Sequence, residues 1–263
     1  MVLALILACR APAPPLAPVA TPVTPNWMLA SRHSGNPLVI AHRGASKVAP
    51  ENTLAAYRLA LELGATAVET DVHTTLDGEV LVIHDPTTER TTGVNSVVGE
   101  TTAADLRALD AGSWKSPAYV GERFPLLGEV LDLVRGRAVL CLELKAGEAL
   151  VPRSVALIDA RSMRASIVVF SFDTALLAES KAAMPDVPAL LLTTPEGEPP
   201  VYTVAAVEAA RALGVDAVGF SHRHLPREVV DEAHRQGFPV FTWTVNTPED
   251  ARRLRDWGVD GLI

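Results

Sequence analysis

Short apolar runs alternate with longer segments of helical periodicity along most of the chain. The runs are rich in β-branched residues and lie at residues 38–41, 67–72, 138–144, 167–170, 189–192, 217–220, 240–245 and 261–263. Candidate helices occupy residues 53–63, 126–134, 148–160, 174–184, 201–213, 227–236 and 248–257. Strands that alternate with helices favour right-handed parallel βαβ units, and eight such units close into a barrel. The pattern predicts an α/β protein with a TIM (β/α)8 barrel over residues 37–263.

One segment interrupts this alternation. The stretch TTLDGEVLVIHD, residues 74–85, has a turn at Asp77 and Gly78 and then continues directly into another apolar run, which predicts a hairpin. We interpret residues 73–125 as a small insertion between the second strand and its helix, at the active-site mouth. The chain stops at Ile263, within the eighth strand, so we expect the final helix to be missing and apolar surface to be exposed.

Residues 1–36 differ in composition from the rest. The apolar run MVLALILAC ends at Cys9 and is followed by a segment rich in proline and alanine, which cannot form a packed core. It resembles the end of a bacterial lipoprotein signal, which would give a lipid anchor and a place in the cell envelope, periplasm or outer face. The alternative is a disordered extension of a cytoplasmic protein. No run of about 18 apolar residues occurs, so a membrane is reached only through such an anchor.

Charge limits the partners. The formal net charge is −8, whereas binding to DNA or RNA requires clustered lysine and arginine, so no nucleic-acid partner is expected. Any phosphate that the protein recognises is then local and small.

Ionisable side chains gather where the predicted strands end. Residues i and i+2 point to the same side of a strand, and the carboxyl ends of barrel strands meet at one mouth. The residues concerned are His42 and Arg43 after the first strand, Glu69 and Asp71 on the second, His84 on the inserted strand, and Glu143 and Lys145 on the third. Glu143 and Lys145 could equally form a simple internal ion pair, but seven such groups at the strand ends of one barrel favour a functional site.

The residue types indicate the chemistry. Three carboxylates without cysteine form a hard oxygen site suited to one divalent cation, Ca²⁺ or Mg²⁺, with Mn²⁺ possible. Two histidines supply a proton acceptor and a proton donor near neutral pH. Arg43 and Lys145 add the positive charge that a phosphate needs.

Several motifs occur together in a characteristic order. They are HRGASKVAPENT, VETDVHTTLDGEVLVIHDPTTERTTG, LELK, FTWTVN and GVDGLI. From about residue 37 to its end the chain resembles the glycerophosphodiester phosphodiesterase family. The resemblance implies a TIM barrel enzyme that splits a small glycerophosphodiester into sn-glycerol 3-phosphate and an alcohol.

The resemblance also implies residue roles. His42 and His84 form the acid/base pair, and Glu69, Asp71 and Glu143 bind the cation. Arg43 and Lys145 hold the phosphate, Glu51 orders the site, and Trp243 contacts the glycerol end.

Two further roles follow from the residues at the start of the first helix. We expect Gly44 to allow close approach of backbone to ligand and Asn52 to cap the helix. The nucleophile is water or the substrate's own glycerol hydroxyl, passing through a cyclic phosphate.

Two alternatives share this site. One is a barrel that binds glycerophosphodiesters without cleaving them, and the other is a different phosphodiesterase or a phospholipase D-like activity. The sequence leaves the head group, the cellular metal and the oligomeric state open.

Overall fold

A single curled β-sheet runs through residues 36–263, which are the residues that the computed structural model describes. Its strands are hydrogen-bonded in the order β1-β9-β8-β7-β6-β5-β4-β2-β3. Their bounds are β1 Leu38–Val39, β2 Ala67–Thr74, β3 Val80–Val82, β4 Val139–Ala146, β5 Ile167–Ser171, β6 Ala189–Leu192, β7 Ala217–Ser221, β8 Val240–Trp243 and β9 Gly261–Leu262. All pairings are parallel except that of β3, which lies antiparallel beside β2 and confirms the predicted hairpin.

The sheet closes between β1 and β2 through one short bridge. Ala41 pairs with Val68 in parallel orientation; the Ala41 amide donates to the carbonyl of Ala67 at 3.0 Å, and the Glu69 amide donates to the carbonyl of Ala41 at 2.9 Å. The eight parallel strands therefore form a barrel, and the predicted TIM-type fold is confirmed.

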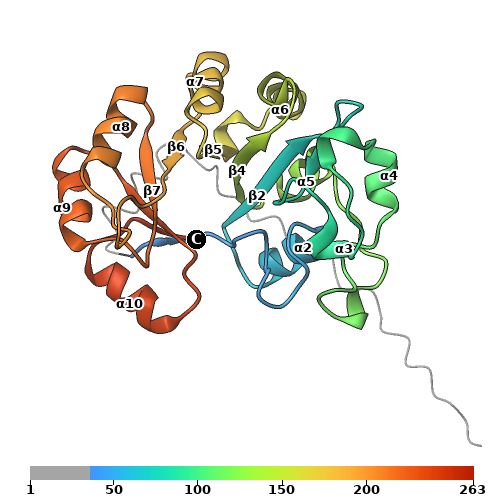
Figure 1. Cartoon of the computed structure of the whole chain (residues 1–263), viewed down its shortest axis with the longest axis horizontal. Coiled ribbons are helices and arrows are strands. Elements are labelled where there is room, and N and C mark those ends of the chain that lie inside the picture. Colours follow the sequence, from blue (N-terminus) through green and yellow to red (C-terminus); the bar gives the residue numbers. More distant parts are fainter. Residues whose placement is uncertain (1–35) are drawn as a thin grey trace, which may run out of the picture.

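Helices follow the strands in succession around the sheet (Figure 1). They are α2 Leu54–Glu62, α5 Leu127–Val134, α6 Leu150–Asp159, α7 Thr174–Ala183, α8 Ala205–Leu213, α9 Arg227–Arg235 and α10 Pro248–Asp256. The sequence pattern predicted each of these helices, but it set the start of one of them too early. Val201 was assigned to the start of α8, but it forms an antiparallel bridge with Glu196 instead, so the helix begins four residues later.

Strand alternation divides the apolar residues into two cores. Inside the barrel, Ala67 and Cys141 pack among inward-facing residues of the other strands. On the outer side, Val68 and Val72 of the same strand β2 pack against residues of the helices, including Tyr57. Because the inner core fills the barrel, polar inward-facing residues are confined to the strand ends.

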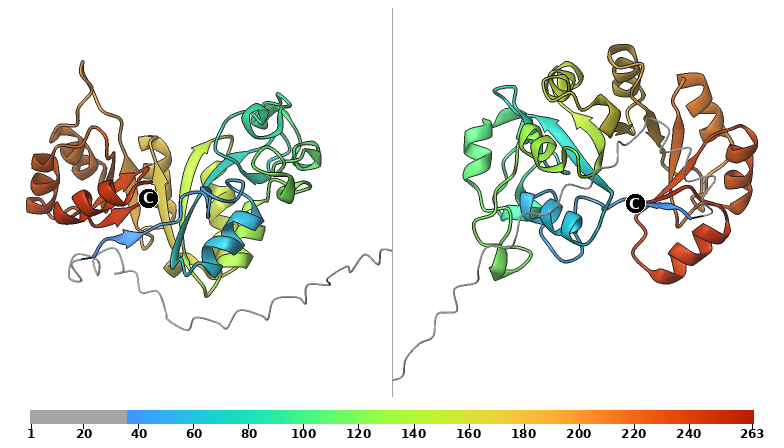
Figure 2. Two further views of the ribbon diagram at one scale, coloured as in Figure 1. Left: turned by 90° about the horizontal axis from the view of Figure 1, so that it is seen from below. Right: turned by 180° about the vertical axis from the view of Figure 1, so that it is seen from behind.

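The insertion after β2 forms a small lobe with its own core. It carries the short helices α3 Glu89–Thr92 and α4 Ala103–Ala108, and Leu81, Leu106 and Phe124 are buried within it. Lys115 Nζ donates to the carbonyl of Ser46 at 2.7 Å, which joins the lobe to the loop after β1. Figure 2 shows the lobe, teal to green, beside α2.

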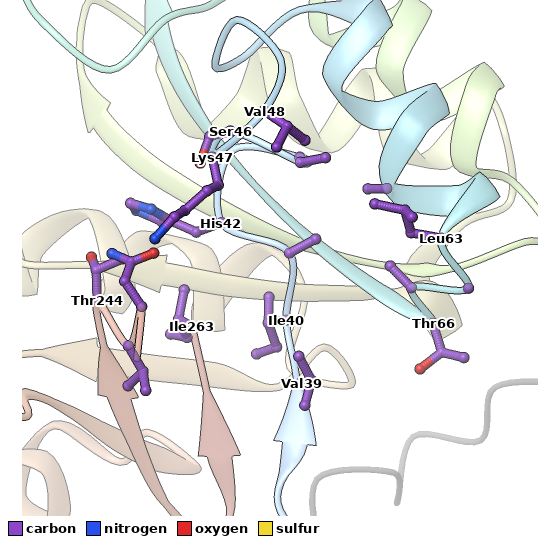
Figure 3. Close-up of a pocket in the computed structure, with 18 residues that line it drawn as sticks. Val39, Ile40, His42, Ser46, Lys47, Val48, Leu63, Thr66, Thr244 and Ile263 are labelled. Atoms are coloured by element: carbon purple, nitrogen blue, oxygen red, sulfur yellow. The ribbon is translucent and has the colours of Figure 1, made fainter. Parts of the chain in front are cut away.

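The outer face between β9 and β1 carries an apolar cavity of about 630 Å³ (Figure 3). Val39 and Leu63 line it and are 66% and 71% exposed. Exposed apolar side chains are therefore present on this face of residues 36–263.

The predicted leader and proline-rich tether, residues 1–36, lie outside the described residues except for Asn36. Within the described part, every helix is too short or too polar to cross a membrane.

Gly44 stands where the loop after β1 meets α2. Its φ is +76°, and a β-carbon there would lie 2.7 Å from the carbonyl carbon of Ala56. The glycine was expected to admit a ligand, but its close neighbour is the backbone of α2, because the loop turns back onto the helix that follows it. Gly64, at the end of α2, has φ +87° and open space around the same position.

We expect Gly44→Ala to lower the free energy of unfolding by about 2–4 kcal/mol, the sum of left-handed backbone strain and overpacking. Gly64→Ala carries the backbone strain alone and should cost about 1–2 kcal/mol. Urea denaturation followed by circular dichroism measures both. Equal losses for the two variants would show that contact with α2 is unimportant.

Candidate active site at the barrel mouth

Three carboxylates meet at the carboxyl ends of two neighbouring strands. Glu69 and Asp71 alternate on β2, and Asp71 lies directly beside Glu143 of β4 in the parallel register. All three side chains are buried, and one oxygen from each lies within 4.8 Å of the others. The structure therefore brings together the three predicted metal ligands.

Burial and mutual repulsion raise the pKa values of these carboxyl groups, whereas the neighbouring cations lower them. Burial raises the pKa of Glu69 well above its usual range, and the charges of Asp71 and Glu143 raise it further. Burial, followed by the charge of Asp71, raises the pKa of Glu143 to about 7. Burial alone would raise the pKa of Asp71 too, but Lys145 and Arg43 outweigh it and lower that pKa. Asp71 is thus the constant negative charge of the cluster.

Lys145 and Arg43 hold this cluster from two sides. Lys145 Nζ lies 3.0 Å from Asp71 Oδ1 and also donates to Glu143 Oε1. The Arg43 amide donates to Glu69 Oε2 at 2.8 Å, while its guanidinium Nε lies 3.3 Å from Asp71 Oδ2. The internal ion pair of Glu143 and Lys145 therefore exists, and it forms part of the carboxylate cluster.

The two histidines reach the cluster from different parts of the chain. His42 follows β1, and its Nε2 lies 3.9 Å from Glu69 Oε2. Burial, with the charge of Arg43, lowers the pKa of His42 to about 4, so the ring is neutral at physiological pH. His84 comes from the insertion, and burial lowers its pKa as well. Both line one cavity of about 350 Å³ together with Glu69, Glu143 and Lys145.

Sequence reasoning missed the residues that orient His84. Asp85 Oδ1 lies 2.6 Å from His84 Nδ1. Burial would raise the pKa of Asp85, but hydrogen bonds from Arg90 and His84 lower it to about 2. The ionised carboxylate accepts the Nδ1 proton, which leaves Nε2 for the cavity. His73 Nε2 donates to the carbonyl of His84 at 3.0 Å and fixes the backbone.

Glu51 joins the two halves of the site. Its carboxylate accepts from Arg43 Nη1 at 2.8 Å and from both terminal nitrogens of Arg90, at 2.9 and 2.7 Å. Arg90 Nε donates to Asp85 Oδ2 at 2.6 Å. The arginine in TTERTTG is the signal that could have revealed this network, because a buried glutamate before the first helix needs a cation.

Asn52 was expected to cap α2, and this was wrong. The N-cap is Thr53, whose hydroxyl accepts from the Ala56 amide at 3.2 Å. Asn52 is buried with φ +56°, and its Nδ2 donates to Asp71 Oδ2 at 2.8 Å. Its backbone shape turns the amide away from the helix and toward the carboxylates, so it serves the site.

Aromatic side chains form the opposite wall of the cavity. Trp243, at the end of β8, lines it, and its indole Nε1 is buried without a hydrogen-bond partner among the described residues. Phe172, which sequence reasoning did not single out, packs edge-to-face on Trp243 with ring centres 5.6 Å apart. A polar ligand group at this wall could accept from the indole N–H.

The carboxylate cluster has the properties of a cation site. Its donors are all oxygens, which suit Ca²⁺ or Mg²⁺. Glu69 Oε1 is buried and accepts no hydrogen bond from residues 36–263. A buried acceptor of this kind fits a ligand to a cation, so the chain could hold one between Glu69, Asp71 and Glu143.

Comparison with known proteins identifies the family of this barrel. The model of the "Glycerophosphoryl diester phosphodiesterase family" matches residues 42–263. The chain therefore belongs to this family.

Individual relatives cover most of the chain. A protein of Caldanaerobacter subterraneus subsp. tengcongensis named glycerophosphodiester phosphodiesterase is 36% identical over 235 residues, which are 86% of this chain and 93% of the relative. One of the same name from Bacillus subtilis is 32% identical over 243 residues, 86% and 82% of the two chains. The solved structure of an Oleispira antarctica phosphodiesterase in complex with the product sn-glycerol-3-phosphate matches with a TM-score of 0.78 and 30% sequence identity, covering 88% of this chain and 94% of that chain.

The raised pKa of Glu143 predicts how cation binding depends on pH. A cation competes with the proton on this carboxyl group, so deprotonation above about pH 7 favours binding and protonation below it opposes binding. We expect the apparent affinity for Ca²⁺ or Mg²⁺ to fall up to about tenfold for each unit below pH 7. Calorimetric titration of chelator-treated protein at pH 6, 7 and 8 tests this. Equal affinity at pH 6 and pH 8 would contradict it.

Proposed function

We propose that this protein hydrolyses glycerophosphodiesters to sn-glycerol 3-phosphate and an alcohol, with a divalent cation held by Glu69, Asp71 and Glu143. The observation that carries the proposal is the convergence of these carboxylates within 4.8 Å, with His42 Nε2 3.9 Å from Glu69. Membership of the family and the product bound in the Oleispira antarctica relative support this substrate class.

The cation and the charged side chains would bind different parts of the phosphodiester or orient one another. When bound, the cation supplies Lewis-acid stabilisation of the phosphoryl oxygens. Lys145 and Arg43 line the cavity beside the carboxylates and would pair with the same oxygens as negative charge concentrates there. Glu51 keeps the Arg43 guanidinium in place through its 2.8 Å hydrogen bond. Trp243 would contact the glycerol half of the substrate.

The histidines move the protons. His42, neutral because burial lowers its pKa to about 4, accepts the proton of the nucleophile, which is water or the glycerol hydroxyl. The nucleophile's oxygen bonds to phosphorus as the bond to the departing alcohol breaks. When that oxygen comes from the glycerol hydroxyl, water then adds to phosphorus and breaks one ring P–O bond of the cyclic phosphate, which gives sn-glycerol 3-phosphate. His84, whose protonated ring Asp85 stabilises, donates a proton to the departing oxygen. Both imidazoles face the same cavity, so one reaction centre can use both.

A barrel that binds the diester without cleaving it would need the phosphate-binding residues but neither histidine. Asp85 accepts hydrogen bonds from both His84 and Arg90 and so orients the imidazole, which a pure binding site has no use for. This observation favours hydrolysis over binding alone, and over a site with a single acid or base.

His42→Ala should lower turnover of glycerophosphocholine at least a thousandfold while the protein stays folded, because the base is lost. Release of sn-glycerol 3-phosphate and thermal melting measure the two effects. His224→Ala, a histidine remote from the carboxylates, is the matched control.

Chelation should also abolish activity, and Ca²⁺, Mg²⁺ or Mn²⁺ added back in turn identifies the metal. Turnover by the chelated protein would exclude the cation, and substantial turnover by His42→Ala would exclude this histidine as the base.

Arg90→Gln tests the network around His84. Asp85 would lose its Nε partner and Glu51 both of its hydrogen bonds from Arg90, so His84 would be misplaced. We expect kcat to fall about tenfold to a hundredfold with a much smaller change in KM. Arg252→Gln, at an exposed pair with Glu249 on α10, is the control. A change confined to KM would show that Arg90 acts on binding.

The cell-envelope location stays a prediction from residues 1–36, and it does not bear on the chemistry of the barrel. Metabolic labelling with a clickable fatty acid, compared between the native chain and Cys9→Ser, tests the lipid anchor.

A further inference from the structure

A second cavity adjoins the catalytic one at the barrel mouth. It has a volume of about 310 Å³ and lies between the end of β6 and the start of α8. Phe172 and Leu192 line both cavities. A substrate bound at the carboxylates can therefore extend past Phe172 into the second cavity. Figure 2 shows the loop after β6 rising on the same side of the barrel as the insertion.

The two cavities differ in their basic residues. Arg43 and Lys145 line the catalytic cavity together with Glu69 and Glu143, two of the carboxylates proposed to hold the cation. The second cavity is lined by threonines, apolar residues and Glu196, and none of its lining residues is a lysine or arginine. Phe172 marks the boundary, with Lys145 Nζ 5.9 Å from its ring centre. Positive charge at one end and negative charge at the other suit a ligand with the opposite arrangement.

The loop that carries Glu196 is held in a defined shape. The Glu196 amide donates to the Val201 carbonyl at 3.1 Å, and the Val201 amide donates back at 2.9 Å. Below them the buried Tyr202 hydroxyl donates to the Thr193 carbonyl at 2.8 Å. The Glu196 side chain is exposed and makes no hydrogen bond or ion pair within residues 36–263. Its backbone is fixed while its carboxylate stays available.

We propose that the second cavity binds the alcohol half of the substrate and selects amino alcohols, such as choline or ethanolamine, through Glu196. The cationic nitrogen would pair with the Glu196 carboxylate, and its carbon atoms would pack on Phe172, which is 41% exposed. This inference rests on the proposed function, because it assigns the leaving half of the same diester. Leu192 forms the apolar floor between the two subsites.

Three diesters with the same glycerophosphoryl half test the subsite: glycerophosphocholine and glycerophosphoethanolamine, whose alcohol halves are cationic, and glycerophosphoglycerol, whose alcohol half is uncharged. In Glu196→Gln we expect KM for the two diesters of cationic alcohols to rise about two- to fivefold, the range of an exposed ion pair. KM for glycerophosphoglycerol and all kcat values should stay unchanged. Glu196→Lys should enlarge the effect, and Glu198→Gln, an exposed carboxylate on the same loop that lines neither cavity, should show none.

The experiments distinguish failure of the Glu196 subsite from failure of the proposed hydrolysis. If KM changes equally for diesters of cationic and of uncharged alcohols, or for none, Glu196 does not select the amino alcohol and only this inference is overturned. If the wild-type protein with added metal releases sn-glycerol 3-phosphate from no diester, the proposed function is overturned. Calorimetric binding of glycerophosphocholine to wild type and Glu196→Gln then still decides the subsite. Raising NaCl from about 50 to 500 mM should reduce the wild-type preference for diesters of cationic alcohols, because salt screens an exposed pair.

Discussion

The need to balance buried charge at the barrel mouth organises this protein. Glu69, Asp71 and Glu143 lie within 4.8 Å of one another and away from water, an arrangement that like charges oppose. Lys145 and Arg43 offset part of that repulsion, and burial raises the pKa of both Glu69 and Glu143, which favours the neutral form of these two carboxyl groups. Removing one partner from a buried charge pair typically costs about 3–5 kcal/mol, so these residues are constrained by stability as well as by function.

The same balance explains local features that look unrelated. Arg43 and Asn52 both adopt positive φ, which carries backbone strain, and both then place a donor on a carboxylate of the cluster. The single bridge between Ala41 and Val68 brings the loop after β1 beside β2, where Glu69 and Asp71 lie. Barrel closure therefore brings Arg43 to the acids, whereas Lys145 lies on β4, which pairs directly with β2.

The insertion supplies a second layer of the site. It delivers His84, the carboxylate that orients it and the arginine that holds that carboxylate, and through Glu51 it connects to the loop after β1. The charged residues continue outward, from a cavity lined by Arg43 and Lys145 beside the carboxylates to a second one, beyond Phe172, lined by Glu196 and by no lysine or arginine. A barrel of this kind can vary its choice of alcohol through one loop while the centre of the mouth stays the same.

The sequence by itself determined the barrel and the identity of the three carboxylates and two histidines. Strand periodicity puts Glu69 with Asp71, and Glu143 with Lys145, on one strand face, and parallel strands end at one mouth. The local sequence pattern could not predict the hydrogen bond of Asn52 to Asp71 or that of Arg90 to Glu51. Nor could it predict that Glu196 lines a second cavity. Those contacts join residues from separate segments through loop conformations, and loop conformation depends on the buried charges and packing that exist only after the barrel has closed.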